Sequence, residues 1–424
     1  MYNCGCDDCK DKATLLNLSI SDDFKQLLNA GKSAFKRLHE IGNYKPQDLK
    51  TEKVYQDLIH QTYDVFNFAI TDNDMPNEMR TALQSDAFLF GGLKTHAQLF
   101  EASKLLLDEN GNLKPFNQLS NEFDKLNLTY NKNYLEAEYE FAVSSSQMAA
   151  GWSELGSSER YFLQYRTSKD NRVRDEHAAL NNTTLPKEDP FWDSYYPPNG
   201  WRCRCIAIEV LKDKYPISDS EKSIKAGEAA TTQIGKDGKN RLEIFRFNPG
   251  ADKKLFPPKH PLFANRCTGD GKLSVTGLIG APVLILSAEK SKCEASKIIE
   301  EIQKENTSKA IKQSRIDIKE WAKDNLIGKT VKHPNIEKPI LFTSTGIKEA
   351  LNQPHKFILE KNKAVKNIES LIKDSEFVKS DKDSKGRSVE YHYLKTQINK
   401  EDSYIIIKYQ ENRNSFYSIV EKLK

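Results

Sequence analysis

Apolar residues recur at three- and four-residue spacing through much of the segment 1–150, and this pattern predicts amphipathic helices. We expect one helix to begin at Ser21, because a serine side chain can cap the free backbone N–H groups and Asp22 and Asp23 suit the first turn. Further helices are predicted over Val54–Ile70 and Tyr134–Trp152. The N-terminal region is therefore predicted to be largely helical.

The segment 165–205 has no clean period and mixes prolines, aromatic residues and charges of both signs. Such a segment needs specific tertiary contacts to be ordered, which indicates a site or an assembly surface. The run Pro197, Pro198, Asn199 and Gly200 predicts an extended stretch followed by a turn.

The period changes from helical to alternating within the last quarter of the chain. A short strand at 340–342, a helix at 347–351 and a second helix at 364–372 come first. Alternating patterns at 389–394, 404–409 and 416–420 then predict a three-stranded meander with polar turns between the strands. The predicted fold class is α+β.

The distribution of charge indicates that the C-terminal part of the chain is a separate module. The chain has 424 residues and a net charge of +4, but residues 329–424 hold 19 Lys and Arg against 13 Asp and Glu, a net of +6. A basic module indicates contact with phosphate, and an ordinary solvated surface accounts for the excess equally well. The longest apolar run, Thr276–Ala288, is too short to cross a bilayer, so no membrane span is expected.

The N-terminus lacks the pattern of a secretory signal, so we expect synthesis in the cytoplasm and cysteines that act as thiols or metal ligands. His177, Cys203 and Cys205 are candidate ligands of a structural zinc ion, because imidazole and thiolate are the ligands that zinc prefers. Cys267, His260 or Asp175 would complete the set.

One residue between Cys203 and Cys205 is a shorter spacing than usual, and the alternative is a packed histidine beside small buried thiols. The N-terminal cluster of Cys4, Cys6 and Cys9 leaves the same two interpretations open.

The middle segment carries a set of uncommon residue groups in a fixed order: Asp170, Arg172, Val173 and Arg174; His177, Ala178, Ala179 and Leu180; Asp189, Pro190, Phe191 and Trp192; and finally Pro197, Pro198, Asn199, Gly200, Trp201, Cys203, Arg204 and Cys205. In this order and spacing the segment resembles the phage Mu F-like head morphogenesis family. The stretch Phe245–Phe263 is similar to part of the larger members. The resemblance implies a minor protein of the virion, at the capsid interior or the portal vertex, with the portal protein, other head proteins and phage DNA as partners. From the residues themselves we favour an ion-pair network of Asp170, Arg172 and Arg174 that fixes the loop, rather than catalysis.

The C-terminal part of the chain resembles the phage branch of the barnase–EndoU–colicin–RelE nuclease superfamily. The resemblance lies in the order of its predicted elements, the sequence of residues 333–355 and the closing meander. The resemblance implies a metal-independent ribonuclease that acts on RNA, often as a toxin domain. Such an enzyme needs a base, an acid and a cation for the phosphorane. The candidate catalytic residues are Lys348, His355, His392 and Ser418. Lys348 and His355 would share one helix face if the helix at 347–351 continues to residue 355. The candidate nucleic-acid-binding residues are Lys408 and Arg413.

The predicted domains are a helical region at 1–130, a Mu F-like domain at 131–270, a connector at 271–335 and a nuclease-like domain at 336–424. The predicted function is a phage or prophage minor head protein with a C-terminal ribonuclease. One alternative is a non-catalytic module that binds nucleic acid or a virion protein. Another is a prophage toxin that uses the head domain for delivery and has an immunity protein as partner.

Overall fold

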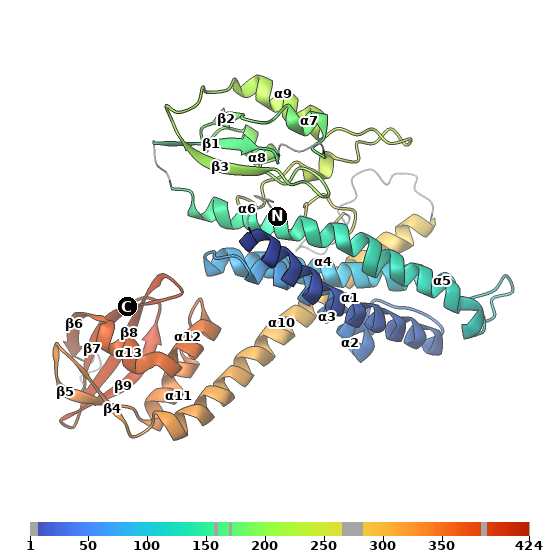
Figure 1. Cartoon of the computed structure of the whole chain (residues 1–424). Helices are drawn as coiled ribbons and strands as arrows, with labels where there is room; N and C mark the ends of the chain where they lie inside the picture. The colour runs from blue at the N-terminus through green and yellow to red at the C-terminus, as the bar shows by residue number, and fades with distance from the viewer. Residues whose placement is uncertain (1–6, 157–159, 169–171, 265–282, 383–387, 424) are drawn as a thin grey trace. The chain divides into compact units, whose positions relative to one another are not determined.

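A computed structural model describes residues 7–156, 160–168, 172–264, 283–382 and 388–423, with side chains from Phe24 onward and, in the long helix α10, from Ala288 onward. The chain divides into two compact units, residues 1–303 and 304–424, called unit 1 and unit 2 below (Figure 1). The fold class is α+β, as the sequence predicts. None of the described helices combines the length and the apolar character that a bilayer span requires.

Unit 1 begins with helices that pack around one apolar core (Figure 1). The expected start at Ser21 is wrong, because α1 runs without a break through this position. The expected helices at 54–70 and 134–152 are confirmed as α3 and α6. The helical elements of this part are α1 (Asp7–Ile41), α2 (Asp48–Thr51), α3 (Lys53–Thr71), α4 (Asn77–Ser103), α5 (Phe116–Leu128), the π-helix η1 (Thr129–Tyr134) and α6 (Leu135–Glu154).

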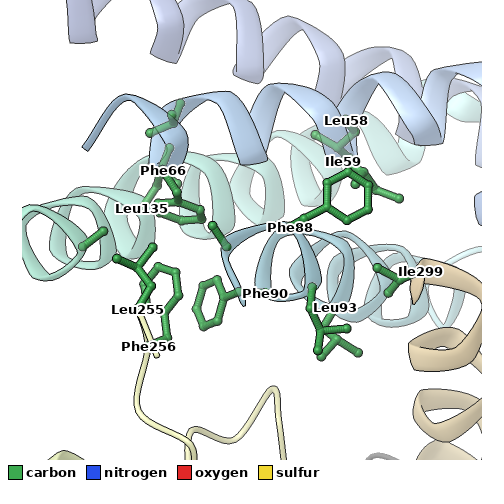
Figure 2. Packing of buried hydrophobic residues seen from close by; sticks show 14 of the residues in the cluster. Leu58, Ile59, Phe66, Phe88, Phe90, Leu93, Leu135, Leu255, Phe256 and Ile299 are labelled. Atoms are coloured by element: carbon green, nitrogen blue, oxygen red, sulfur yellow. The ribbon is translucent and has the colours of Figure 1, made fainter. Parts of the chain in front are cut away.

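Aromatic rings from distant parts of the sequence meet in the centre of this core (Figure 2). Phe90 of α4 stacks on Phe256 with ring centroids 3.8 Å apart, and Phe66 of α3 meets Phe256 edge-on at 4.9 Å. All three rings are fully buried. The irregular segment that contains Phe256 is therefore part of the core of unit 1.

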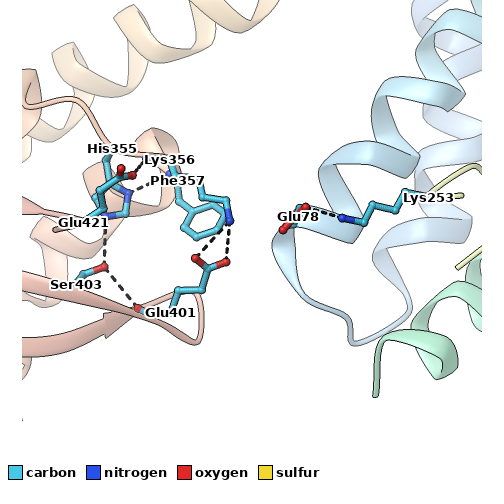
Figure 3. A network of polar contacts seen from close by, with 8 residues as sticks. All are labelled: Glu78, Lys253, His355, Lys356, Phe357, Glu401, Ser403 and Glu421. Atoms are coloured by element: carbon cyan, nitrogen blue, oxygen red, sulfur yellow. Dashed lines mark hydrogen bonds and ion pairs between the residues drawn. The ribbon is translucent and has the colours of Figure 1, made fainter. Parts of the chain in front are cut away.

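Polar groups inside unit 1 are paired across elements. Asp86 of α4, with its side chain 1% exposed, accepts hydrogen bonds from the backbone N–H groups of Leu255 and Phe256 and from Lys254. These bonds hold the irregular segment 254–256 against α4. An exposed ion pair between Glu78 and Lys253 joins the same two parts (Figure 3).

The rest of unit 1 contains a three-stranded antiparallel sheet of order β2-β1-β3, with short helices beside it (Figure 1). Its buried residues form a core of their own around Trp192, Phe191 and Tyr165. The elements are β1 (Tyr161–Arg166), α7 (Asp175–Ala178), β2 (Thr184–Leu185), α8 (Phe191–Tyr195), β3 (Ile206–Leu211), α9 (Ser220–Ala230) and the 3₁₀ helix η2 (Glu243–Phe245). The peptide bond between Pro197 and Pro198 is cis.

Helix α10 (Val283–Asn325) supplies Ile298, Ile299 and Ile302 to the core of unit 1, and Ile318 and Ala322 to the core of unit 2. Trp321 packs against the core of unit 2.

Unit 2 is a six-stranded mixed sheet of order β4-β5-β9-β8-β7-β6 with helices packed on it. The expected meander is present as β7, β8 and β9, with positive φ angles at Asn399 and Lys400 in one turn and at Glu411 and Asn412 in the other. The elements are β4 (Thr330–His333), β5 (Ile336–Leu341), α11 (Ser344–Asn352), α12 (Ile358–Ala364), the 3₁₀ helix η3 (Val365–Asn367), α13 (Ile368–Asp374), β6 (Glu376–Lys382), β7 (Glu390–Ile398), β8 (Glu401–Gln410) and β9 (Arg413–Val420).

Candidate functional site

Three residues that the sequence indicates as metal ligands come together in the small sheet region of unit 1. His177 lies in α7, while Cys203 and Cys205 lie between the turn at Gly200 and the start of β3. Cys203 and Cys205 belong to the buried core around Trp192, so the packing of this core fixes their positions.

The ligand atoms of the three residues all lie within 4.8 Å of one another. The Nδ1 atom of His177 is 3.6 Å from the sulfur of Cys203 and 3.7 Å from the sulfur of Cys205. The residues are 2%, 7% and 4% exposed respectively, so the cluster is shielded from water. Both cysteines are free thiols.

The two sulfurs differ in their affinity for a proton. The hydrogen bond from the thiol of Cys205 holds the pKa of Cys203 well below its usual range. The same contact, together with burial, raises the pKa of Cys205. The contact between the two sulfurs therefore favours the loss of a proton from Cys203 before Cys205.

Tyr165 and Arg174 surround the cluster. Tyr165 is completely buried and donates a hydrogen bond to Asn199 at 3.0 Å, and its burial raises its pKa well above the usual value. Arg174 donates to the carbonyl of Trp201 at 2.8 Å and places a second nitrogen 3.5 Å from Nε2 of His177. Arg174 thus ties α7 to the turn that carries the cysteines. The expected partner Asp170 lies outside the described residues.

A cavity of about 750 Å³ opens beside the cluster, and all three candidate ligands line it. Acidic residues of α6, Glu136 and Glu140, lie on its wall, and basic residues from the segment that carries the cluster complete it: Arg172, Arg174, Arg202 and Arg204. No sequence motif marks the two glutamates, and their spacing of four residues on a helix is the signal that places them on one face.

The other predicted ligands are not part of the cluster among the described residues. Asp175 is exposed at the start of α7. His260 packs against the rings of Phe90 and Trp201, where burial lowers its pKa to about 3, and among the described residues it is not part of the group. Cys267, Cys4 and Cys6, and the side chain of Cys9, lie outside the described residues.

The candidate catalytic residues before the meander of unit 2 do not share a helix face. Helix α11 ends at Asn352, so Lys348 is exposed on α11 while His355 lies in the following loop. The N–H of Phe357 donates to Nδ1 of His355 at 3.0 Å, which leaves the proton of the neutral ring on Nε2, facing Ser403 at 3.3 Å (Figure 3). Burial lowers the pKa of this imidazole.

The candidates on the meander point to different sides of the sheet. His392 pairs with Ile407 in the register and lies on the face that the helices cover, where its Nδ1 meets the hydroxyl of Ser380 at 2.7 Å. Lys408 lies on the opposite face by strand alternation. Ser418 is 1% exposed and makes no hydrogen bond with the residues that are described, and Arg413 is exposed at the start of β9.

The fold and its cluster define a two-unit α+β protein with a histidine–cysteine centre in its first unit. The family description "Phage Mu protein F like protein" matches residues 112–208, a stretch that contains His177, Cys203 and Cys205. This part of the chain is similar to the phage Mu F-like family. The description "Large polyvalent protein-associated domain 3" matches residues 309–417, which is most of unit 2.

Two curated proteins are similar to parts of this chain. The "Putative capsid assembly protein F" of Escherichia phage Mu is 50% identical over 44 residues, which is 10% of this chain and 10% of that protein. The "Mu-like prophage FluMu F protein" of Haemophilus influenzae is 34% identical over 87 residues, which is 19% of this chain and 20% of that protein. The chain thus matches only a tenth to a fifth of the length of these relatives. No solved structure matches.

Proposed function

We propose that this chain takes part in the assembly of a phage head, through the Mu F-like part of unit 1. The match to the family over residues 112–208 carries the proposal, and a relative described as a capsid assembly protein supports it. In its finer form the proposal is a minor component of the virion, at the portal vertex or inside the capsid, in contact with other head proteins and phage DNA.

Deletion of the gene from the phage or prophage that encodes it tests this function. We expect fewer DNA-filled heads in electron micrographs after induction, and recovery when the wild-type chain is supplied in trans. Mass spectrometry of purified particles should detect the chain. Normal numbers of filled heads without the gene, and particles that lack the chain, would contradict the proposal.

A matched control separates the two units. A chain that ends at Gln303 keeps the whole of unit 1, so it should restore head formation if assembly depends on the Mu F-like part. Failure of this shortened chain, while it is present in soluble form, would move the assembly role to unit 2.

For unit 2 we propose binding of single-stranded nucleic acid, which is the non-catalytic alternative. The sheet face away from the helices carries tyrosines and a lysine, here called the tyrosine face: Tyr391, Tyr393, Tyr404, Lys408 and Tyr417. The rings of Tyr391 and Tyr417 lie 5.8 Å apart, and the amino group of Lys379 lies 5.4 Å from the centre of the Tyr393 ring. Aromatic rings with nearby cations are the elements on which single-stranded bases stack.

Fluorescence anisotropy with a short labelled RNA tests this binding in the full chain. Replacement of Tyr391 and Tyr417 by alanine should weaken binding about tenfold, since stacking contributes about 1–3 kcal/mol per base. His392→Ala, on the opposite face, is the matched control and should leave the affinity unchanged. Equal affinities for all three proteins would contradict the tyrosine face as the binding surface. The ribonuclease, toxin and immunity-protein interpretations stay predictions.

A further inference from the structure

The sulfurs of Cys203 and Cys205 lie at nearly the same distance from one nitrogen of His177. Both sulfurs lie within 3.7 Å of the same nitrogen, Nδ1 of His177. An imidazole nitrogen has one lone pair or one proton in the plane of the ring, so it makes one good hydrogen bond. Hydrogen bonding to His177 therefore accounts for the position of one sulfur, and the equal distance of the other is not required by it.

A tetrahedral metal ion accounts for these distances. Zinc binds sulfur at about 2.3 Å and nitrogen at about 2.0–2.1 Å, which at tetrahedral angles separates a sulfur from a nitrogen by about 3.5–3.6 Å. The distances of 3.6 Å and 3.7 Å from Nδ1 to the two sulfurs are close to this separation. Two thiolates also balance the charge of a divalent cation, which removes the cost of burying either alone.

We propose that His177, Cys203 and Cys205 bind one zinc ion that joins α7 to the segment before β3. The proposal is independent of a role in head assembly. Among the described residues no further His, Cys, Asp or Glu joins the group, so a water molecule from the adjoining cavity would be the fourth ligand.

The role that the burial favours is structural. Helix α7 has only four residues and receives no side-chain cap at its start, so it needs an external tie. An ion held by α7 and by the cysteine segment would provide this tie at the edge of the sheet. The site would then also fix the wall of the cavity that Arg202 and Arg204 share.

The test measures metal in the full chain with Cys4, Cys6 and Cys9 changed to serine, so that the N-terminal cysteines cannot contribute. Elemental analysis of protein purified with zinc and a reductant should give about one zinc per chain. Cobalt taken up in its place should show thiolate charge-transfer absorption and the intense visible bands of a tetrahedral ion. Cys203→Ser, Cys205→Ser and His177→Ala should each lower the zinc content at least fivefold.

Asp175→Asn is the matched control, because this exposed carboxylate lies on the same helix but outside the cluster, and it should retain the full zinc content. A folded parent chain that contains no zinc and gives no cobalt spectrum would overturn the proposal. Full zinc content in folded Cys203→Ser protein would overturn it as well. If the ligand variants fail to fold, the cobalt spectrum of the parent chain is the deciding measurement. Thiolate absorption in this spectrum can arise only from Cys203, Cys205 or the two remaining cysteines, Cys267 and Cys293. The added changes Cys267→Ser and Cys293→Ser distinguish these two sources.

Discussion

Buried charge is the feature of single residues that most constrains unit 1. Lys94 of α4 and Glu138 of α6 form an ion pair of 2.5 Å, with side chains 1% and 8% exposed. Burial lowers the pKa of Lys94 and raises that of Glu138, while the partner opposes each change. Since each charge is shielded from water, each depends on the other for compensation.

Removal of one partner should therefore destabilise unit 1 more than removal of both. We expect Lys94→Met to lower the free energy of unfolding by about 3–5 kcal/mol, because an uncompensated carboxylate remains in the core. The double variant with Glu138→Leu should recover most of this loss. Urea unfolding followed by tryptophan fluorescence in a Trp321→Phe background reports on unit 1, which holds the other three tryptophans. A double variant no more stable than Lys94→Met would contradict the argument.

Two buried histidines should make unit 1 sensitive to mild acid. Burial lowers the pKa of His96 to about 4 and that of His260 to about 3, whereas an exposed histidine titrates near pH 6.5. Below pH 6.5 the unfolded chain therefore binds protons that the folded chain does not, and stability falls as the pH falls. From pH 7.5 to 5.5 each histidine should contribute a loss of about 1.4 kcal/mol.

The change His260→Gln separates this effect from other titrating groups. It should reduce the loss between pH 7.5 and 5.5 by about 1.4 kcal/mol, measured by urea unfolding at both pH values. The same pH dependence in the wild type and the variant would show that His260 does not stay neutral in the folded state.

At the scale of elements, the hydrophobic pattern of the sequence predicts a helix or strand where that element buries one face. The alternation at 404–409 predicted β8, which lies inside the sheet and buries Ile405 and Ile407. Strand β6 was not predicted, because it lies at the sheet edge and nearly all of its residues are exposed. The expected continuation of α11 failed at Pro354, which forces an extended conformation on Gln353.

The candidate metal ligands were identified by residue type and local spacing, since imidazole and thiolate are the ligands that zinc prefers. Tyr165, which contacts the cluster, and Glu140, which lines the cavity beside it, were not identified, because only tertiary contacts place them there. Such contacts follow from the packing of α6 and β1, which no local pattern encodes.

The contact between α11 and β9 offers a test at this scale. Gly346 lies in the first turn of α11, where a Cβ atom would come within 1.9 Å of the carbonyl oxygen of Phe416. We expect Gly346→Ala to destabilise unit 2 by about 1–3 kcal/mol or more, because the helix must move away from the strand. Hydrogen exchange of peptides from β8 and β9, read by mass spectrometry, should be faster in this variant.

Gly328→Ala is the matched control, since nothing lies within 4 Å of the Cβ position there. Its cost of about 1 kcal/mol comes only from the positive φ angle. Equal effects of the two substitutions would mean that α11 adapts to the added methyl group without loss.

At the scale of the whole molecule, each unit has its own core and its own family match. A head-assembly role and a nucleic-acid role can therefore reside in one chain without sharing residues. Each role can then be removed separately, which makes the ribonuclease interpretation of unit 2 testable in the intact chain.

The full chain, wild type and His392→Ala, incubated with total RNA and EDTA, distinguishes binding from cleavage. Metal-independent cleavage needs an acid and a base at one phosphate. His392 and Lys408 lie on opposite faces of the sheet, and Nε2 of His355 faces the hydroxyl of Ser403. We therefore expect intact RNA with both proteins. Fragments that survive EDTA and disappear with His392→Ala would instead establish a ribonuclease whose groups come together only when RNA binds.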